Sequence, residues 1–211
     1  MPPERVLGDE FGVTRVTVRQ AVLHLEGEGL VRRTKRGRRG WFVVPKPLRY
    51  DPAKHKNFDR NAREQGREPR FDLEGRMRVS ADAELASLFG VERGTSLIRV
   101  SGVGFLDGHQ VYAEEIYLLA EAVPGFLDRP YRSPLTDFVA EEFGLIVKQA
   151  GFHARSTRLT PAESAALDVV PDTPGLRLTR VKADRNGRIV QVDREAWIAS
   201  AIEIVVGELP D

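Results

Sequence analysis

The sequence predicts an α+β protein in two parts: a small unit of two helices and a two-stranded hairpin, followed by a larger domain on an antiparallel sheet. Three observations carry this prediction. Apolar residues recur at helical spacing between residues 3 and 29. Strand-like runs flank two hairpin turns, Asp107-Gly108 and Asn186-Gly187. A weak internal repeat places the same residue types 79 residues apart, as in Ala83 and Ala162.

The composition excludes several classes of protein. The 211 residues contain no cysteine, so a disulfide framework and a thiolate metal site are both excluded. The four histidines are scattered without a metal-binding spacing, and we expect no metal and no cofactor. No apolar run approaches membrane-spanning length, and the first residues lack the apolar core of a signal peptide. These features predict a cytoplasmic protein without a membrane partner.

The charge is unevenly distributed along the chain. Residues 1–49 carry a net charge of +6, which leaves −5 for the rest of a chain whose total is +1. The stretch "RRTKRGRR" (32–39) alone holds six cations. A basic N-terminal part joined to a larger acidic part indicates that the first contacts a polyanion and the second does not.

Two helices are predicted in the N-terminal part. The first covers residues 3–11, is opened by a proline and is broken by Gly12. The second is capped by Thr14 and ends at the glycines that follow. Its apolar residues share one face, whereas Arg15 and Arg19, four residues apart, share another, with Thr17 and Gln20 nearby.

Two short strands, 30–33 and 41–44, are predicted to flank the basic loop. Prolines 45 and 47 end this unit, and residues 46–58 are interpreted as a linker. Helix, turn, helix and a basic two-stranded wing form the layout of a winged helix-turn-helix, whose second helix fits the DNA major groove while the wing reaches the backbone or minor groove. The alternative is an amphipathic helix with a solvated charged face.

The internal repeat organises the remaining domain. Each copy is predicted as a short helix, a turn, a long strand, a hairpin turn with positive φ at both central residues, and a returning strand. Between the copies, residues 133–145 are predicted to form a helix capped by Ser133 and stopped at Gly144. The residues shared by the copies are Ala83, Glu84, Ala86, Leu88, Val91, Leu97, Gly108 and Val111, which recur as Ala162, Glu163, Ala165, Leu167, Val170, Leu176, Gly187 and Val190.

The N-terminal residues "PPERVLGDEFGVTRVTVRQAVLHLEGEGLVRR" closely resemble the DNA-binding domain of the GntR family of bacterial transcription regulators. That family shows Leu-Pro-x-Glu-Arg, then Phe-Gly-Val-Ser-Arg-x-Thr-Val-Arg, then Leu-x-x-Glu-Gly-Leu. The resemblance implies operator contacts by Arg5, Thr14, Arg15, Thr17 and Arg19, with Arg36 and Gly37 at the wing tip. The helix pattern and the loop charge add Gln20, Arg38 and Arg39.

Two departures from the family pattern concern the same unit. The wing "GRRGWFV" (37–43) is one residue longer than the usual Gly-Arg-Gly-Thr-Phe-Val and carries Trp41 in place of threonine. Family members also carry a helix before this motif, and we interpret its absence here as a misassigned or truncated start. Without that helix, Phe11, Val18 and Val22 are expected to lack a covering layer, which would lower stability and weaken DNA binding.

The rest of the chain resembles the UTRA effector domain of the HutC-type branch of this family. The resemblance implies a chorismate-lyase-like fold, a small-molecule effector and a homodimer. Members that bind phosphorylated sugars carry Arg-x-Arg where this chain has Gly102-Val103-Gly104, so a sugar phosphate is not expected, and the glycines are expected to leave space. The matching segments are 62–69, 88–100, 107–118, 133–138 and 180–197.

Several residues align with effector contacts of this domain: Glu114, Ser133, Gln191 and Trp197. Each has a structural alternative, respectively a surface carboxylate, a helix cap, a polar strand residue and a core tryptophan. Arg180 and Lys182, on one strand face, could supply charge to the pocket or pair with Asp184 or Asp193 at the surface.

Together these features predict a DNA-binding transcription regulator, taken to be a repressor, that is controlled by a metabolite and is not an enzyme. A homodimer would place two recognition helices on a pseudo-palindromic operator in double-stranded DNA. The expected parts are a winged helix (1–45), a linker (46–58) and the effector and dimerisation domain (59–211). The alternatives are a small-molecule enzyme of chorismate-lyase-like fold and a ligand-binding module without DNA binding.

Overall fold

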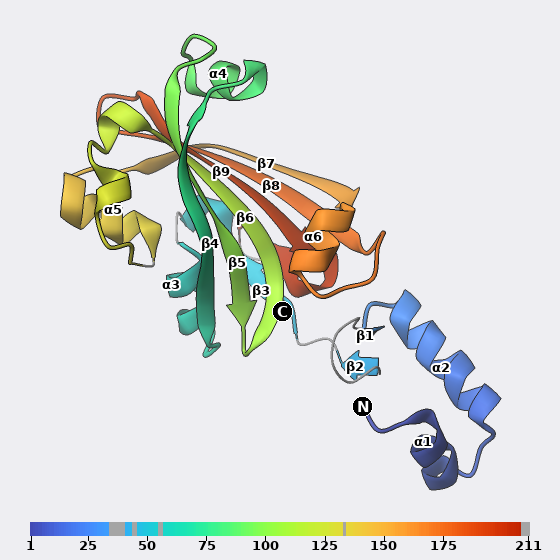
Figure 1. Ribbon diagram of the computed structural model, residues 1–211. Helices are drawn as coiled ribbons and strands as arrows, with labels where there is room; N and C mark the ends of the chain where they lie inside the picture. The colour runs from blue at the N-terminus through green and yellow to red at the C-terminus, as the bar shows by residue number, and fades with distance from the viewer. Residues whose placement is uncertain (34–40, 44–45, 55–56, 133, 208–211) are drawn as a thin grey trace.

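The computed structural model describes residues 1–33, 41–43, 46–54, 57–132 and 134–207 (Figure 1). The N-terminal unit has the predicted order of elements. Gly12, at a φ of 63°, ends the first helix, and the Thr14 side chain caps the second by accepting from the amide of Thr17 at 3.2 Å. The basic loop between the strands lies outside the described residues. The elements are α1 (Glu4–Phe11), α2 (Arg15–Gly27), β1 (Val31–Arg33) and β2 (Trp41–Val43).

A small apolar cluster holds this unit together. Val18 and Val22 of α2 are buried with Val31 of β1, and Leu7 and Trp41 are among the residues packed against them. The expectation that Val18 and Val22 would be uncovered is therefore wrong, because α1 and both strands supply the cover. Trp41, the departure from the family wing, is part of that cover.

The apolar surface that remains on this unit lies elsewhere. Phe11 is 68% exposed, as expected, and Val16 is 66% exposed. Neither residue belongs to the buried cluster.

The second domain is built on a six-stranded antiparallel sheet. Its strand order is β4-β5-β6-β9-β8-β7. The first copy of the repeat, with the strand before it, contributes β4, β5 and β6 from one edge, and the second, with the strand before it, contributes β7, β8 and β9 from the other, so the two copies meet where β6 pairs with β9 (Figure 1). The elements are β4 (Pro69–Ser80), α4 (Ala83–Phe89), β5 (Ser96–Leu106), β6 (His109–Leu119), β7 (Lys148–Arg158), α6 (Pro161–Ala166), β8 (Pro174–Ala183) and β9 (Ile189–Ile198).

Both faces of the sheet are covered. The repeat helix α4 and the segment containing α6 pack on one face, against residues such as Leu97 and Ala196. The helices α3 (Phe58–Glu64) and α5 (Leu135–Phe143) pack on the other. Short 3₁₀ turns complete the connections: η1 (Pro52–Lys54), η2 (Ala120–Ala122), η3 (Phe126–Asp128) and η4 (Ala199–Ala201).

Part of the predicted linker is regular structure. Within 46–58, β3 (Leu48–Tyr50) pairs in parallel with β10 (Ile202–Ile204). Leu48 is 1% and Tyr50 4% exposed, and both join the core around Trp197. Burial of two large side chains on alternate residues explains why this stretch forms a strand.

The structure differs from the prediction at one hairpin turn and at one helix cap. Asp107 and Gly108 have φ of 51° and 81°, as predicted, whereas Asn186 has no positive φ and only Gly187, at 80°, does. The Asp184 carboxylate accepts from the amide of Asn186 at 2.8 Å, which closes a longer turn. The cap position of α5 is Pro134, which has no side-chain oxygen to offer; the predicted cap, Ser133, lies outside the described residues.

Candidate functional site

The exposed side of the N-terminal unit carries the predicted DNA-contact residues. Those within the described part of the chain are all exposed, and they lie on α1, on α2 and on the turn between the two helices: Arg5, Thr14, Arg15, Thr17, Arg19 and Gln20. The other four predicted contacts, Arg36, Gly37, Arg38 and Arg39, lie outside the described residues.

The two arginines of α2 have different surroundings. Arg15 Nε donates to Glu4 Oε2 at 3.1 Å, and this hydrogen bond lowers the pKa of Glu4. Arg19 forms no hydrogen bond or ion pair with any residue that the structure describes. Arg15 therefore ties α2 to α1, while Arg19 is available to an external anion.

A pocket opens on the sheet face that carries α3 and α5. Its floor consists of side chains from three adjacent strands, with Glu114 on β6, Arg180 and Lys182 on β8, and Gln191 and Asp193 on β9. Residues at the starts of α3 and α5 form its walls, together with β4: Asn57, Phe58, Asp59, Pro69, Arg70, Phe71, Pro134, Leu135 and Thr136. Tyr112, Ile116 and Tyr131 complete the lining.

Two buried ion pairs cross from β8 to β9 in and beneath this floor. Lys182 Nζ lies 2.7 Å from Asp193 Oδ2, and Arg180 pairs with Glu195. The other oxygens of the two acids accept from side chains on the same strand: Gln191 Nε2 donates to Asp193 Oδ1 at 2.6 Å and Trp197 Nε1 to Glu195 Oε2 at 2.5 Å. Because these acids are almost fully buried, each depends on its paired cation as a counter-ion.

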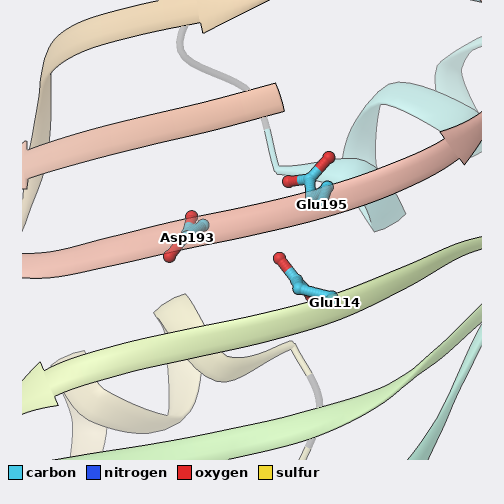
Figure 2. A group of neighbouring side chains, drawn as sticks. All are labelled: Glu114, Asp193 and Glu195. Atoms are coloured by element: carbon cyan, nitrogen blue, oxygen red, sulfur yellow. The ribbon is translucent and has the colours of Figure 1, made fainter. Parts of the chain in front are cut away.

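Glu114 is the third acid of this group. Figure 2 shows its side chain extending from β6 toward Asp193 and Glu195 on β9; one oxygen of each of the three lies within 4.8 Å of the others. Among the described residues, no hydrogen bond or ion pair involves the Glu114 carboxyl. Burial and the neighbouring charge of Asp193 raise the pKa of Glu114 to about 7.

This raised pKa predicts a pH dependence of stability. Between about 4.5, the ordinary value, and about 7, the folded chain keeps a proton on Glu114 that the unfolded chain has lost. Raising the pH therefore favours the unfolded state, and the free energy of unfolding should fall through this range. Urea unfolding at a series of pH values should show a flatter profile for Glu114→Gln than for the original chain. Identical slopes for the two proteins would contradict the raised pKa of Glu114.

The predicted effector residues are distributed between the pocket and the core. Glu114, Arg180 and Gln191 line the pocket, as does Lys182. Trp197 lies beneath it, 2% exposed and stacked on Tyr112 at 4.5 Å between ring centroids. Ser133 lies outside the described residues.

Sequence reasoning named Asp193 as a possible partner of Arg180 or Lys182, but at the surface, and it did not name Glu195; the structure pairs Asp193 with Lys182 in the buried floor. Every second residue from Gln191 to Trp197 is polar or aromatic, and strand periodicity places them all on one face. The same alternation gives Arg180 and Lys182 on the neighbouring strand. Matching these two polar strand faces would have predicted the ion pairs.

The space expected beside Gly102 and Gly104 is occupied. A Cβ on Gly102 would lie 2.5 Å from the Phe71 ring, and one on Gly104 would lie 2.0 Å from the Tyr112 ring. The expectation of room for a bulkier effector at these glycines is therefore wrong, because two aromatic rings fill that room. Longer side chains at either position would require these rings to move.

Comparison with known proteins accounts for both parts of the chain. The model of bacterial regulatory proteins of the gntR family matches residues 1–43, and the UTRA domain model matches residues 64–203. The chain belongs to the GntR family and carries a UTRA domain. Among the described residues, no helix is long and apolar enough to cross a membrane.

Relatives of this GntR-family chain are transcription regulators, not enzymes. An uncharacterized HTH-type transcriptional regulator of Escherichia coli K12, YihL, is 34% identical over 98% of this chain and 87% of its own length. The HTH-type transcriptional repressor PhnF of Mycolicibacterium smegmatis is 29% identical over 93% of this chain and 79% of its own. The HTH-type transcriptional repressor NagR of Bacillus subtilis is 24% identical over 89% and 76%.

A solved structure shows the same fold. The crystal structure of PhnF from Mycobacterium smegmatis superposes with a TM-score of 0.72, covering 100% of this chain and 92% of that one at 24% identity. The family models and relatives show that the chain is a DNA-binding transcription regulator, and the fold is a winged helix-turn-helix followed by an α+β UTRA domain.

Proposed function

We propose that this regulator is a repressor of the HutC-type branch whose operator affinity is controlled by a small molecule bound in the pocket beside Glu114, Arg180 and Gln191. It acts in the cytoplasm as a homodimer that presents two α2 helices to a pseudo-palindromic operator. Repression is supported by PhnF and NagR, both named repressors. Residues 1–45 form the DNA-binding part, 46–58 the connection, and 59–211 the effector and dimerisation part.

The observation that carries this proposal is a structural route from the pocket to the DNA-binding unit. β9 contributes Gln191 and Asp193 to the pocket and then leads into η4. A Cβ on Gly29, just after α2, would lie 3.7 Å from the Ser200 Cβ in η4. A ligand that shifts β9 would therefore move η4 and change the position of α2 relative to the C-terminal domain, which would couple the two sites.

The proposed DNA contacts are those named from the sequence. Arg15 and Arg19 would reach base edges or phosphates from α2, and Thr14, Thr17 and Gln20 add donors at the same surface. Thr14 Oγ1 caps α2 by accepting from the backbone amide of Thr17, and the two hydroxyls also bond each other at 2.9 Å. Replacing Thr14 would mix loss of contact with loss of the cap, so it is a poor probe of DNA binding.

Arg19→Ala is the sharper test of DNA recognition. Because Arg19 has no hydrogen-bond or ion-pair partner among the described residues, its loss should leave the fold intact while reducing operator affinity by about tenfold or more. The slope of log affinity against log salt should also fall by about one if a phosphate contact is lost. Both quantities can be measured by gel shift on a pseudo-palindromic operator selected from random duplexes.

Arg93→Ala provides the matched control. It removes one exposed arginine from the loop after α4 and should leave operator affinity unchanged. Equal losses in the two variants would show that only overall charge matters, and no loss in either would contradict DNA recognition by α2.

A further inference from the structure

We propose that the effector is a small organic molecule that presents a protonated amine to the Glu114 carboxylate and a second hydrogen-bond donor to the Gln191 amide oxygen. This inference rests on the proposed function in that it names the chemical class of ligand for the same pocket. Its basis is the balance of charge in the pocket and the kind of hydrogen-bonding group left without a partner.

When Glu114 is ionised, the charged side chains of the floor carry one negative charge in excess. Three carboxylates, Glu114, Asp193 and Glu195, face two cations, Arg180 and Lys182, and each cation is paired with one of the β9 acids. A ligand amine at Glu114 would balance the remaining charge. A phosphate would instead add negative charge to a site already in excess. Lys182 would have to leave its partner to hold it, and Arg180 could offer only its Nε, which has no hydrogen-bond partner among the described residues.

The charged residues of the walls do not alter this balance. Arg70 of β4 is paired with Asp72, and Asp59 of α3 accepts from Arg63 Nε at 2.8 Å. Each wall charge is thus compensated outside the floor. The excess at Glu114 remains the feature that a ligand would meet.

Gln191 gives an independent indication of a donor group on the ligand. Its side chain is fully buried and lines the pocket, yet its Oε1 has no hydrogen-bond partner among the described residues. The orientation of the amide is fixed by Asp193, since only the Nε2 side can donate to that carboxylate. A buried acceptor without a donor is costly, and a ligand N–H or O–H would satisfy it.

A divalent metal ion fits this group of acids less well than an amine. Calcium and magnesium require several oxygen ligands. The four oxygens of Asp193 and Glu195 are already engaged: Gln191 and Trp197 donate hydrogen bonds to two of them, and Lys182 and Arg180 form ion pairs with the others. Only Glu114 offers free oxygens, which suits one ammonium group.

Amine binding at Glu114 is expected to depend on pH. The charged groups facing Glu114 are Asp193 and Glu195 of β9 and Arg180 and Lys182 of β8, with Asp59 and Arg70 in the walls. Because the pKa of Glu114 is about 7 in the empty pocket, an amine that binds the ionised form would displace a proton. Affinity should therefore rise from pH 6 to pH 8, a range in which an alkylamine stays protonated.

Matched ligands test this inference on the full chain. Each set would contain the primary amine, the alcohol and the phosphate monoester of one small carbon skeleton, across linear and cyclic skeletons. Thermal shift would identify binders, and calorimetry would give their affinities. Calorimetry in two buffers of different ionisation enthalpy would also give the number of protons released on binding. We expect at least one amine to bind about tenfold or more tightly than its alcohol, with proton release near pH 7.

Two variants separate Glu114 from general charge effects. Glu114→Gln should abolish both the preference for amine over alcohol and the proton release. Glu115→Gln removes the next carboxylate on β6, which pairs with Arg99 and accepts from the Tyr117 hydroxyl, and should change neither. Tightest binding by phosphate monoesters, amine binding that survives Glu114→Gln, or a series in which no amine binds would each overturn the inference.

The same ligands in an operator gel shift distinguish this inference from the proposed function. A phosphate ester that binds and changes operator affinity would refute the amine and retain effector control. An amine that binds through Glu114 but leaves operator affinity unchanged would confirm the ligand class and contradict effector control.

Discussion

Replacing Arg180 by methionine is expected to lower the free energy of unfolding of the C-terminal domain by about 3–5 kcal/mol. Arg180 is 7% exposed and pairs with Glu195, which is 1% exposed. Its Nη1 also donates to the Tyr50 hydroxyl at 3.3 Å, linking β8 to β3. Without the guanidinium, Glu195 would be a buried charge without a counter-ion, and Glu114 and Asp193 would lose a compensating charge.

Arg177→Met is the matched control for this prediction. Arg177 lies on the same strand and pairs with Glu163 at 2.7 Å, but its side chain is 33% exposed. Solvent can replace that pair, so its loss should cost about 1 kcal/mol or less. Urea unfolding of both variants provides the comparison, and equal losses would show that burial of the Arg180 pair adds nothing.

Two further measurements identify the cause of the Arg180→Met loss. Adding Glu195→Gln should recover part of the stability, since the uncompensated carboxylate is then removed. Lowering the pH should also reduce the deficit, because protonation neutralises the buried acid that has lost its counter-ion. A deficit that is independent of pH and of Glu195 would point to lost packing instead.

Local signals in the sequence predicted most of the fold. Thr14 before an apolar helical face and Gly12 after another fixed the two helices of the DNA-binding unit. The Asp107-Gly108 turn and the repeat of Ala83 at Ala162 located the hairpins on either side of the β6–β9 pairing. Each of these signals lies within a few residues of the structure that it specifies, so no knowledge of distant contacts was required.

The candidate site was predicted less completely because its geometry depends on pairing between strands. Glu114 and Gln191 could be named, but that Glu114 stands opposite Glu195 follows only from the register of β6 and β9. In the same way the sequence around Leu48 and Tyr50 predicts a linker, since their parallel partner β10 is far away in sequence. Such contacts leave no periodic trace in either segment alone.

The glycines of β5 give a second example of contacts that the sequence alone does not show. The sequence correctly indicated that Gly102 and Gly104 offer no charge to a ligand, yet it could not show what lies over them. Tyr112 of β6 pairs directly with Gly104 and places its ring over it, whereas Phe71 of β4 also pairs with Gly104 and extends its ring diagonally over Gly102. An absent side chain was therefore interpreted as open space where the structure has a packed ring.

Gly104→Ala is expected to destabilise the C-terminal domain by about 1–3 kcal/mol or more, since overpacking forces neighbouring groups to shift. The added Cβ would stand 2.0 Å from a Tyr112 ring atom. That ring cannot yield easily, because it stacks on Trp197 and meets Phe58 edge-on at 4.9 Å between centroids. Urea unfolding measures the loss directly.

Gly75→Ala tests whether the cost arises from the ring rather than from replacing a strand glycine. Gly75 lies on the neighbouring strand β4, and its added Cβ would have the Ser101 hydroxyl oxygen at 3.6 Å as its nearest contact, an ordinary distance. Alanine there should be neutral or slightly stabilising, because it reduces the conformational entropy of the unfolded chain. If both substitutions are neutral, Tyr112 moves freely and the stack of Tyr112 on Trp197 is not rigid. A large loss confined to Gly104→Ala, relieved by adding Tyr112→Leu, would establish that the glycine is required by the ring above it.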